Sequence, residues 1–232
     1  MSIANSTATL PLDDGLFGQL RREAGALWTG YVRHRFVEAL GDGTLAPAAF
    51  RRYLTQDYLF LVQFARAYAL AGYKGTRLSD LRAAAAAMTA ILETEMPLHV
   101  SYCAGWGISE ADMLNEPEAL ETIAYTRFVL ERGMAGDLLD LHVALAPCVV
   151  GYAEIGDLLS RRPQRPDNPY AAWIAAYAAP EYCRLAGEAI RTLDRLGEER
   201  GAIARWGTLA ATFRAATMLE TAFWAMGLAA AG

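Results

Sequence analysis

The chain has 232 residues, of which 54% are apolar and 20% are charged, and its formal net charge is −5. This composition is typical of a folded globular protein with one sizeable core, and it excludes an intrinsically disordered chain. The acidic balance, without a basic stripe, argues against nucleic acid as a partner. Alanine is abundant and β-branched runs are scarce, which favours helix.

The cysteines and the apolar runs bear on the compartment of the protein. Cys103, Cys148 and Cys183 form neither a CxxC pair nor an even-numbered set, so we expect reduced thiols and a cytoplasmic location. The first residues lack a basic stretch followed by an apolar run, so no signal peptide is expected. The sequence contains no run of about 18 uncharged apolar residues, so no membrane span is expected.

Glycine, proline and acidic capping residues divide the chain into segments with apolar residues at helical spacing. We expect residues 1–13 to form a mobile lead-in. The predicted helices lie, in chain order, at about residues 14–40, 47–72, 79–104, 117–133, 137–160, 171–196 and 202–228. Prolines are expected to bend or interrupt three of them, at Pro97, Pro147 and Pro180. Residues 161–169, rich in proline and charge, are the plainly irregular stretch.

The pattern predicts one all-α domain, spanning residues 1–232, with about seven or eight helices. The sequence contains no internal repeat and no sustained heptad. Several predicted helices are apolar on more than one face, including those at 137–160 and 202–228. Such helices lie at the centre of a bundle or in the interface of an oligomer.

One of these apolar helices carries reactive groups. The stretch LAPCVVGYAEIGDLL, residues 145–159, contains Cys148, Tyr152 and Glu154 within two turns. The thiol and the phenol share a helix face because they are four residues apart. Two interpretations remain open: a cysteine that is simply packed in the core, or a nucleophile held on a rigid element.

Two other helices carry single acids in apolar surroundings. Asp57 lies in QDYLF, one turn before Phe60, and Glu220 lies in TMLETAFWAMGL. A buried carboxylate is costly unless it is bonded, either to an arginine or backbone N–H or to a ligand. Because a bundle can bring side chains from distant helices together in its interior, both acids and Cys148 are candidates for one site.

Five blocks of the sequence together resemble the TenA family. They are GDGTLAPAAFRRYLTQDYLFLVQFA, ETEMPLH, APCVVGYAEIG, WIAAYAAPEY and MLETAFWAMG, and their order and spacing match from about Leu16 to Gly227. The Pro-Cys pair resembles the cysteine-bearing branch. The resemblance implies a haem-oxygenase-like helical bundle, a homotetramer, and thiamin salvage by hydrolysis of 4-amino-5-aminomethyl-2-methylpyrimidine to the 5-hydroxymethyl compound. Thiamin itself is cleaved at the same site in this family, which is also called thiaminase II.

The resemblance also implies roles for individual residues. The nucleophilic cysteine falls on Cys148, the proton-transferring glutamate on Glu220, and the substrate-binding aspartate on Asp57. The aromatic positions around the substrate fall on Phe60, Tyr125, Tyr152 and Tyr177. Bacterial members commonly have a tyrosine where this chain has Phe60, so the ring can still stack on a pyrimidine while a hydroxyl contact is lost.

These residue types suit the chemistry. Aromatic walls can hold the faces of a pyrimidine, and an ionised carboxylate can accept hydrogen bonds from its 4-amino group. Adding a thiolate to a ring carbon breaks the aromaticity and lets the amine leave, so that one difficult step becomes two easier ones. A glutamate can protonate a ring nitrogen as the thiol adds and then help water to attack.

Three alternatives remain open. Glu95 and His99 are four residues apart and could hold part of a di-iron site, but the chain has only three histidines, and a structural role for His99 is favoured. A cofactor-binding oxidase of the pyrroloquinoline quinone synthase branch would need more histidine and arginine around its ligand. A non-catalytic pyrimidine-binding protein would use Cys148 only for packing. We therefore expect neither a metal nor a cofactor.

Overall fold

The computed structural model describes residues 10–163 and 165–230, and every regular element within them is a helix. The predicted all-α class is therefore confirmed. The expected lead-in falls largely on residues 1–9, which lie outside the described residues, whereas Leu12 packs against the core.

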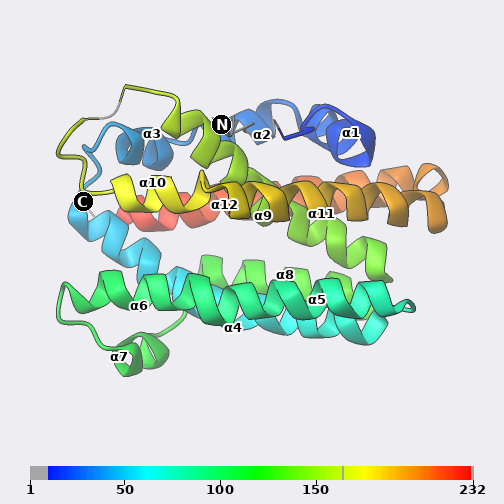
Figure 1. Ribbon diagram of the computed structural model, residues 1–232, viewed down its shortest axis with the longest axis horizontal. Helices are drawn as coiled ribbons and strands as arrows, with labels where there is room; N and C mark the ends of the chain where they lie inside the picture. The colour runs from blue at the N-terminus through cyan, green and yellow to red at the C-terminus, as the bar shows by residue number, and fades with distance from the viewer. Residues whose placement is uncertain (1–9, 164, 231–232) are drawn as a thin grey trace, which may run out of the picture.

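The helices form two layers along the long axis of the molecule (Figure 1). The lower layer in that view contains α4 (Pro47–Lys74), α5 (Leu78–Ala90), α6 (Met96–Ala104), α7 (Glu110–Asn115) and α8 (Leu120–Ala135). The upper layer contains α1 (Gly15–Ala24), α2 (Ala26–Val32), α3 (Arg35–Gly41), α10 (Ala171–Tyr177), α11 (Pro180–Glu199) and α12 (Trp206–Ala229). The helix α9 (Leu138–Ser160) runs obliquely from the lower layer into the upper one. A π-helical turn, η1 (Ile91–Glu95), precedes α6, and a 3₁₀ turn, η2 (Ala202–Arg205), precedes α12.

The described residues form twelve α-helices rather than seven or eight because several predicted segments are divided. The expected first helix breaks at Gly25, whose φ of +49° is accessible to glycine, and again at His34, whose extended backbone begins α3. The η1 turn separates α5 from α6 just before Pro97. In contrast, α9 continues through Pro147.

Two long, almost fully apolar helices, α9 and α12, pack against each other in the core. By length and composition α9 could cross a membrane, but 83% of its most apolar window is buried inside the bundle, and this burial accounts for its composition. Aromatic rings fill the space around α12: Trp224 stacks on Phe36 with ring centroids 4.9 Å apart, and Phe213 stacks on Trp28 at 5.5 Å.

Glu154, the third polar residue of the 145–159 stretch, fixes α1 and α2 to α9. Its carboxylate accepts hydrogen bonds from Arg21 Nε and Nη2, at 3.2 and 2.8 Å, and from Trp28 Nε1 at 2.9 Å. These hydrogen bonds hold helices together, so Glu154 has a structural role and lies outside the candidate site described below.

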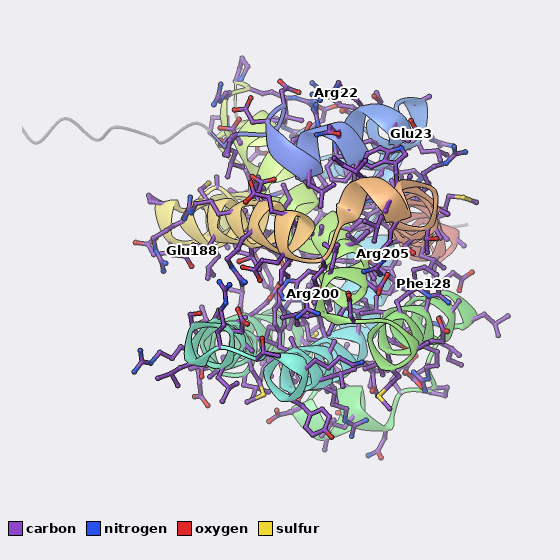
Figure 2. The ribbon with its side chains drawn as sticks, turned by 90° about the vertical axis from the view of Figure 1, so that its right-hand side faces the viewer. Arg22, Glu23, Phe128, Glu188, Arg200 and Arg205 are labelled. Atoms are coloured by element: carbon purple, nitrogen blue, oxygen red, sulfur yellow. The ribbon has the colours of Figure 1, made fainter. Side chains whose placement is uncertain are left out.

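At the other end of α9, arginines join the start of this helix to the chain before α12. Arg205 bonds to Asp137 and Asp140, and Arg200 lies 3.6 Å from Asp137. Figure 2, which looks onto this end, shows Arg200 and Arg205 between the two layers. Asp137 also caps α9 by accepting from Leu139 N and Asp140 N, so this ion-pair cluster fixes where α9 starts.

A first prediction concerns the close approach of α9 and α10. A Cβ added at Gly156 would lie 2.5 Å from the carbonyl carbon of Tyr177, so Gly156→Ala must displace backbone. We expect a loss of about 1–3 kcal/mol in the free energy of unfolding, measured by urea denaturation. Gly30→Ala is the control, because nothing lies within 4 Å of its added Cβ and alanine is the better helix former. Equal stability of the two variants would contradict the packing described.

Candidate active site

Asp57 lies on the buried side of α4, and its two carboxylate oxygens differ. Oδ2 accepts a hydrogen bond from Tyr53 OH at 3.0 Å and lies 2.7 Å from His99 Nε2. Oδ1 makes no hydrogen bond to any of the described residues. One oxygen is therefore held in place by the protein, and the other keeps its capacity to accept a hydrogen bond.

His99 connects this aspartate to the chain at η1. Its Nδ1 lies 2.9 Å from the carbonyl oxygen of Glu95, and since a carbonyl only accepts, Nδ1 carries a proton. Burial lowers the pKa of His99, but the hydrogen bond to Asp57 and the negative charges of Asp57 and Glu95 outweigh that effect and raise it above its usual value. The geometry thus favours an imidazolium paired with a carboxylate.

The carboxyl group of Glu95 points elsewhere, to Tyr177. Glu95 Oε1 accepts a hydrogen bond from Tyr177 OH at 2.7 Å. Burial, together with the charge of Asp57, raises the pKa of this glutamate. Glu95 is the last residue of the π-helical turn, and such turns occur frequently at functional sites because they redirect side chains.

Cys148 on α9 and Glu220 on α12 form the second polar pair. The thiol and the carboxyl group interact electrostatically, and Glu220 Oε1 accepts a hydrogen bond from Tyr125 OH at 2.8 Å. Burial raises the pKa of Glu220 to about 8. Burial and the negative charges of Glu220, Glu95 and Asp57 raise the pKa of the Cys148 thiol well above its usual range. At neutral pH this pair is therefore a thiol beside a largely protonated carboxylic acid.

Aromatic rings surround both polar pairs. Phe60 lies 4.9 Å from Tyr125 and 5.9 Å from Phe223, between centroids. Tyr152 lies 4.9 Å from Tyr177, and its hydroxyl is 3.5 Å from Tyr53 OH. Five residues expected around the substrate therefore meet in one region of the core, although they come from α4, α8, α9 and α10. They are Asp57, Phe60, Tyr125, Tyr152 and Tyr177.

A cavity of about 780 Å³ reaches this region from one side. Cys148 and Glu95 are only partly covered because they face it. At this end the cavity is lined by Phe64, Tyr68, Glu95, Cys148, Tyr177 and Tyr182. The remaining predicted residues lie behind its wall, almost fully buried: Asp57, Phe60, Tyr125, Tyr152 and Glu220.

Sequence reasoning missed several residues of the site. His99 was interpreted as structural, yet it contacts Asp57 directly, and Tyr53, Tyr182 and Phe223 were not considered. The i, i+4 spacing of Glu95 and His99 was the available signal. The imidazole bonds to the main chain of Glu95, whose carboxylate accepts from Tyr177 instead. Across residues 10–163 and 165–230, no group of three or more metal-binding side chains was found.

Comparison with known proteins identifies the family of this chain. The family model described as TENA/THI-4/PQQC matches residues 21–230. An uncharacterised protein of Haemophilus influenzae is 38% identical over 90% of this chain and 97% of its own length. An aminopyrimidine aminohydrolase of Halalkalibacterium halodurans is 36% identical over 89% of this chain and 92% of its own.

Solved structures agree with these sequence matches. A crystal structure from Silicibacter sp. TM1040, described as a TenA family transcription regulator, superimposes with a TM-score of 0.86 and 44% identity, covering 91% of this chain and 96% of that one. A TenA homologue from Pyrococcus horikoshii gives a TM-score of 0.85 with 26% identity, over 94% and 100% of the two chains. The chain therefore belongs to the TENA/THI-4/PQQC family.

Proposed function

We propose that this protein is an aminopyrimidine aminohydrolase that converts 4-amino-5-aminomethyl-2-methylpyrimidine and water to the 5-hydroxymethyl compound and ammonia, a step of thiamin salvage. The observation that carries the proposal is the thiol of Cys148 at the inner end of a cavity, in electrostatic interaction with the buried carboxyl group of Glu220. Relatives from Halalkalibacterium halodurans, Helicobacter pylori and Bacillus subtilis that are named aminopyrimidine aminohydrolases support the substrate class.

Asp57 is the proposed binding group for the substrate's 4-amino substituent. Its Oδ1 makes no hydrogen bond to the described residues and would accept one from that amino group, while Tyr53 and His99 hold Oδ2 and so fix the direction of the carboxylate. A positioned charged acceptor of this kind selects an amino group over a carbonyl at the same ring position. The rings of Phe60, Tyr152 and Tyr177 are the proposed contacts for the pyrimidine faces.

Covalent catalysis by Cys148 accounts for the cleavage of the C–N bond. As the S–C bond forms, Glu220 gives its proton to the adjacent ring nitrogen and takes the thiol proton in exchange. The adduct is no longer aromatic, so its electrons expel the amine, which takes the ring N–H proton and leaves as ammonia. Water then adds to the exocyclic methylene, and loss of the cysteine with the ring proton restores both the aromatic ring and the thiol.

The experiment that tests the proposal follows both products. Purified protein is incubated with the aminomethylpyrimidine, and hydroxymethylpyrimidine and ammonia are quantified by chromatography and by a coupled assay. We expect equal amounts of both. Absence of product, with substrate recovered unchanged, would contradict the proposal. Thiamin serves as a second substrate, because cleavage of its methylene bridge would release the thiazole through the same adduct, as thiaminase II activity requires.

A further prediction concerns pH and Glu220. Because the acid must be protonated when the thiol adds, kcat should fall about tenfold per pH unit above about pH 8, where Glu220 loses its proton. Glu220→Gln should lower kcat by roughly 10²–10⁴-fold and remove that decline. Stopped or coupled assays between pH 6 and 10 provide the measurement. If kcat of Glu220→Gln still falls above about pH 8, a group other than Glu220 causes the decline.

We also propose that the protein is a cytoplasmic homotetramer. All three cysteines are free thiols, as expected in a reducing compartment. The exposed apolar residues Leu120 and Met134 both lie on α8, where a partner subunit could cover them. Size-exclusion chromatography with light scattering should give a mass close to four times 25.2 kDa, and a mass of one chain would contradict this proposal.

A further inference from the structure

Glu95 is an acid of the candidate site that the mechanism described above does not use. Its side chain lines the inner end of the cavity together with Cys148 and Tyr182. Glu95 Oε1 accepts a hydrogen bond from Tyr177 OH at 2.7 Å, whereas Oε2 makes no hydrogen bond to any of the described residues. One oxygen of this carboxyl group is therefore held by the protein, and the other keeps its capacity to accept a hydrogen bond.

Contacts from two other helices determine the position of Glu95. The residue ends the π-helical turn η1, and its main-chain carbonyl accepts from His99 Nδ1 on α6 at 2.9 Å. Its side chain accepts from Tyr177 on α10, and the ring of Tyr177 packs against Tyr182 with centroids 4.9 Å apart. A carboxyl group held in this way does not have to reorganise when a substrate binds, as catalysis by a positioned group requires.

The charge of Glu95 is not used in an ion pair within the described part of the chain. The acids elsewhere on the cavity wall differ in this respect. Asp80 is paired with Arg195, and Glu188, shown on α11 in Figure 2, is paired with Arg184, each at 2.6 Å. A cationic ligand group would therefore be attracted to the Glu95 end of the cavity.

The proposed binding mode brings such a cation to this place. On the pyrimidine, the aminomethyl group at position 5 lies between the 4-amino group, which Asp57 binds, and the neighbouring ring carbon, which the thiol of Cys148 attacks. Glu95 interacts electrostatically with both of these residues. An aminomethyl group is an alkylamine and carries a proton at neutral pH, as the side chain of lysine does. The substrate thus presents an ammonium group between the two residues that Glu95 adjoins.

We infer that Glu95 is a further catalytic residue, which binds the exocyclic ammonium group, keeps the leaving nitrogen protonated and then activates the attacking water. The inference rests on the proposed function and refines the path of its protons. Burial and the charge of Asp57 raise the pKa of Glu95, and the ammonium group offsets both effects. The carboxyl group and the amine then share one proton, which stays on the nitrogen while the C–N bond breaks.

The steps balance with Glu95 in this role. In the adduct, both electrons of the C–N bond go to a nitrogen that already carries three hydrogens, so it leaves as neutral ammonia. The ring N–H proton stays in place instead of moving to the amine, and the ring carries the positive charge. The Glu95 carboxylate takes a proton from water as the water oxygen bonds to the methylene. Loss of the cysteine with the ring proton restores the thiol, and ammonia removes the proton of Glu95 as ammonium.

Calorimetry tests the contact separately from turnover. In the Cys148→Ser protein, which holds ligands without cleaving them, Kd at pH 7 is measured for aminomethylpyrimidine and for hydroxymethylpyrimidine. The two ligands differ only in the cationic amine, and we expect the amine to bind at least about tenfold more tightly. Glu95→Gln keeps an acceptor for Tyr177 but should remove this preference, with the Kd of hydroxymethylpyrimidine unchanged. Glu188→Gln, which neutralises another acid of the cavity wall, is the matched control and should keep the preference.

Single-turnover kinetics tests the chemistry. With Cys148 intact, Glu95→Gln should slow the release of ammonia by roughly 10²–10⁴-fold. Release of the thiazole from thiamin in the first turnover should slow by less than about tenfold, because a thiazolium leaves as neutral thiazole and has no proton to retain. Glu188→Gln should leave both rates unchanged.

The outcomes separate this inference from the proposed function. If the amine preference survives Glu95→Gln, or if this variant releases ammonia at nearly the wild-type rate, the role of Glu95 is refuted and the proposed function stands. Equal losses for ammonia and thiazole would also refute it, because Glu95 would then only position its neighbours. If the wild type releases no ammonia, both are refuted.

Discussion

Replacing Cys148 by serine is expected to abolish the release of ammonia from aminomethylpyrimidine, with a loss of at least 10⁴-fold in kcat. The two side chains are nearly isosteric, but the serine hydroxyl is far less acidic and a poorer nucleophile at neutral pH. The thiol of Cys148 is itself protonated at rest, so its attack depends on passing a proton to Glu220 as the S–C bond forms. Ammonia release is measured under single-turnover and steady-state conditions.

The other two cysteines provide matched controls for this substitution. Cys103 is fully buried, and burial raises the pKa of its thiol to about 11, while Cys183 bonds to the carbonyl of Ala178. Cys103→Ser and Cys183→Ser should keep kcat, although the first should lose stability because it buries a hydroxyl. Iodoacetamide should inactivate the wild type only slowly, because the resting Cys148 thiol is protonated, and hydroxymethylpyrimidine should protect it. Near-normal turnover by Cys148→Ser would rule out the covalent mechanism.

Asp57→Asn should lower kcat/KM by roughly 10²–10³-fold, mainly through weaker binding of the ring. The amide can still accept from Tyr53, but its NH₂ group replaces an acceptor at the open position or faces the imidazolium of His99. In either orientation a donor meets a donor, and a charge-assisted hydrogen bond is lost. Steady-state kinetics with aminomethylpyrimidine give the effect, and calorimetry with hydroxymethylpyrimidine separates binding from chemistry.

Glu154→Gln is the matched control for Asp57→Asn, because it also neutralises a buried carboxylate in the core. Its partners are Arg21 and Trp28, and it does not touch the cavity. It should lower the free energy of unfolding by about 1–3 kcal/mol and leave kcat/KM of the folded protein unchanged. If Asp57→Asn, like Glu154→Gln, lowered the free energy of unfolding but left kcat/KM unchanged, the assignment of Asp57 to substrate binding would be wrong.

The sequence indicated candidate site residues where a polar side chain lies in an otherwise apolar helix. Asp57 and Glu220 stand out as acids among apolar residues on long helices, and the thiol of Cys148 lies on another. The structure places these helices against one another in the core. By the same logic Glu154 was equally conspicuous, yet its partner is Arg21, 133 residues away. A local pattern reveals that a buried acid needs a partner, but it cannot say whether that partner is a distant arginine or a ligand.

Contacts between distant segments account for what the sequence did not predict. His99 and Asp57 are 42 residues apart, and only the packing of α6 on α4 brings them together. The π-helical turn that ends at Glu95 has no clear local signature, although Pro97 follows it closely. The helix breaks at Gly25 and His34 depend on backbone conformations that apolar periodicity does not encode.

A crystal structure of Cys148→Ser with bound hydroxymethylpyrimidine tests the central claim most directly. The account predicts the ring at the inner end of the cavity, with its 4-amino group donating to Asp57 Oδ1, a ring nitrogen facing Glu220, and a ring carbon next to the side chain at position 148. The aromatic rings of Phe60 and Tyr152 should adjust to admit it. A ring bound at the far end near His142, or one without contact to Asp57 and Glu220, would contradict the account.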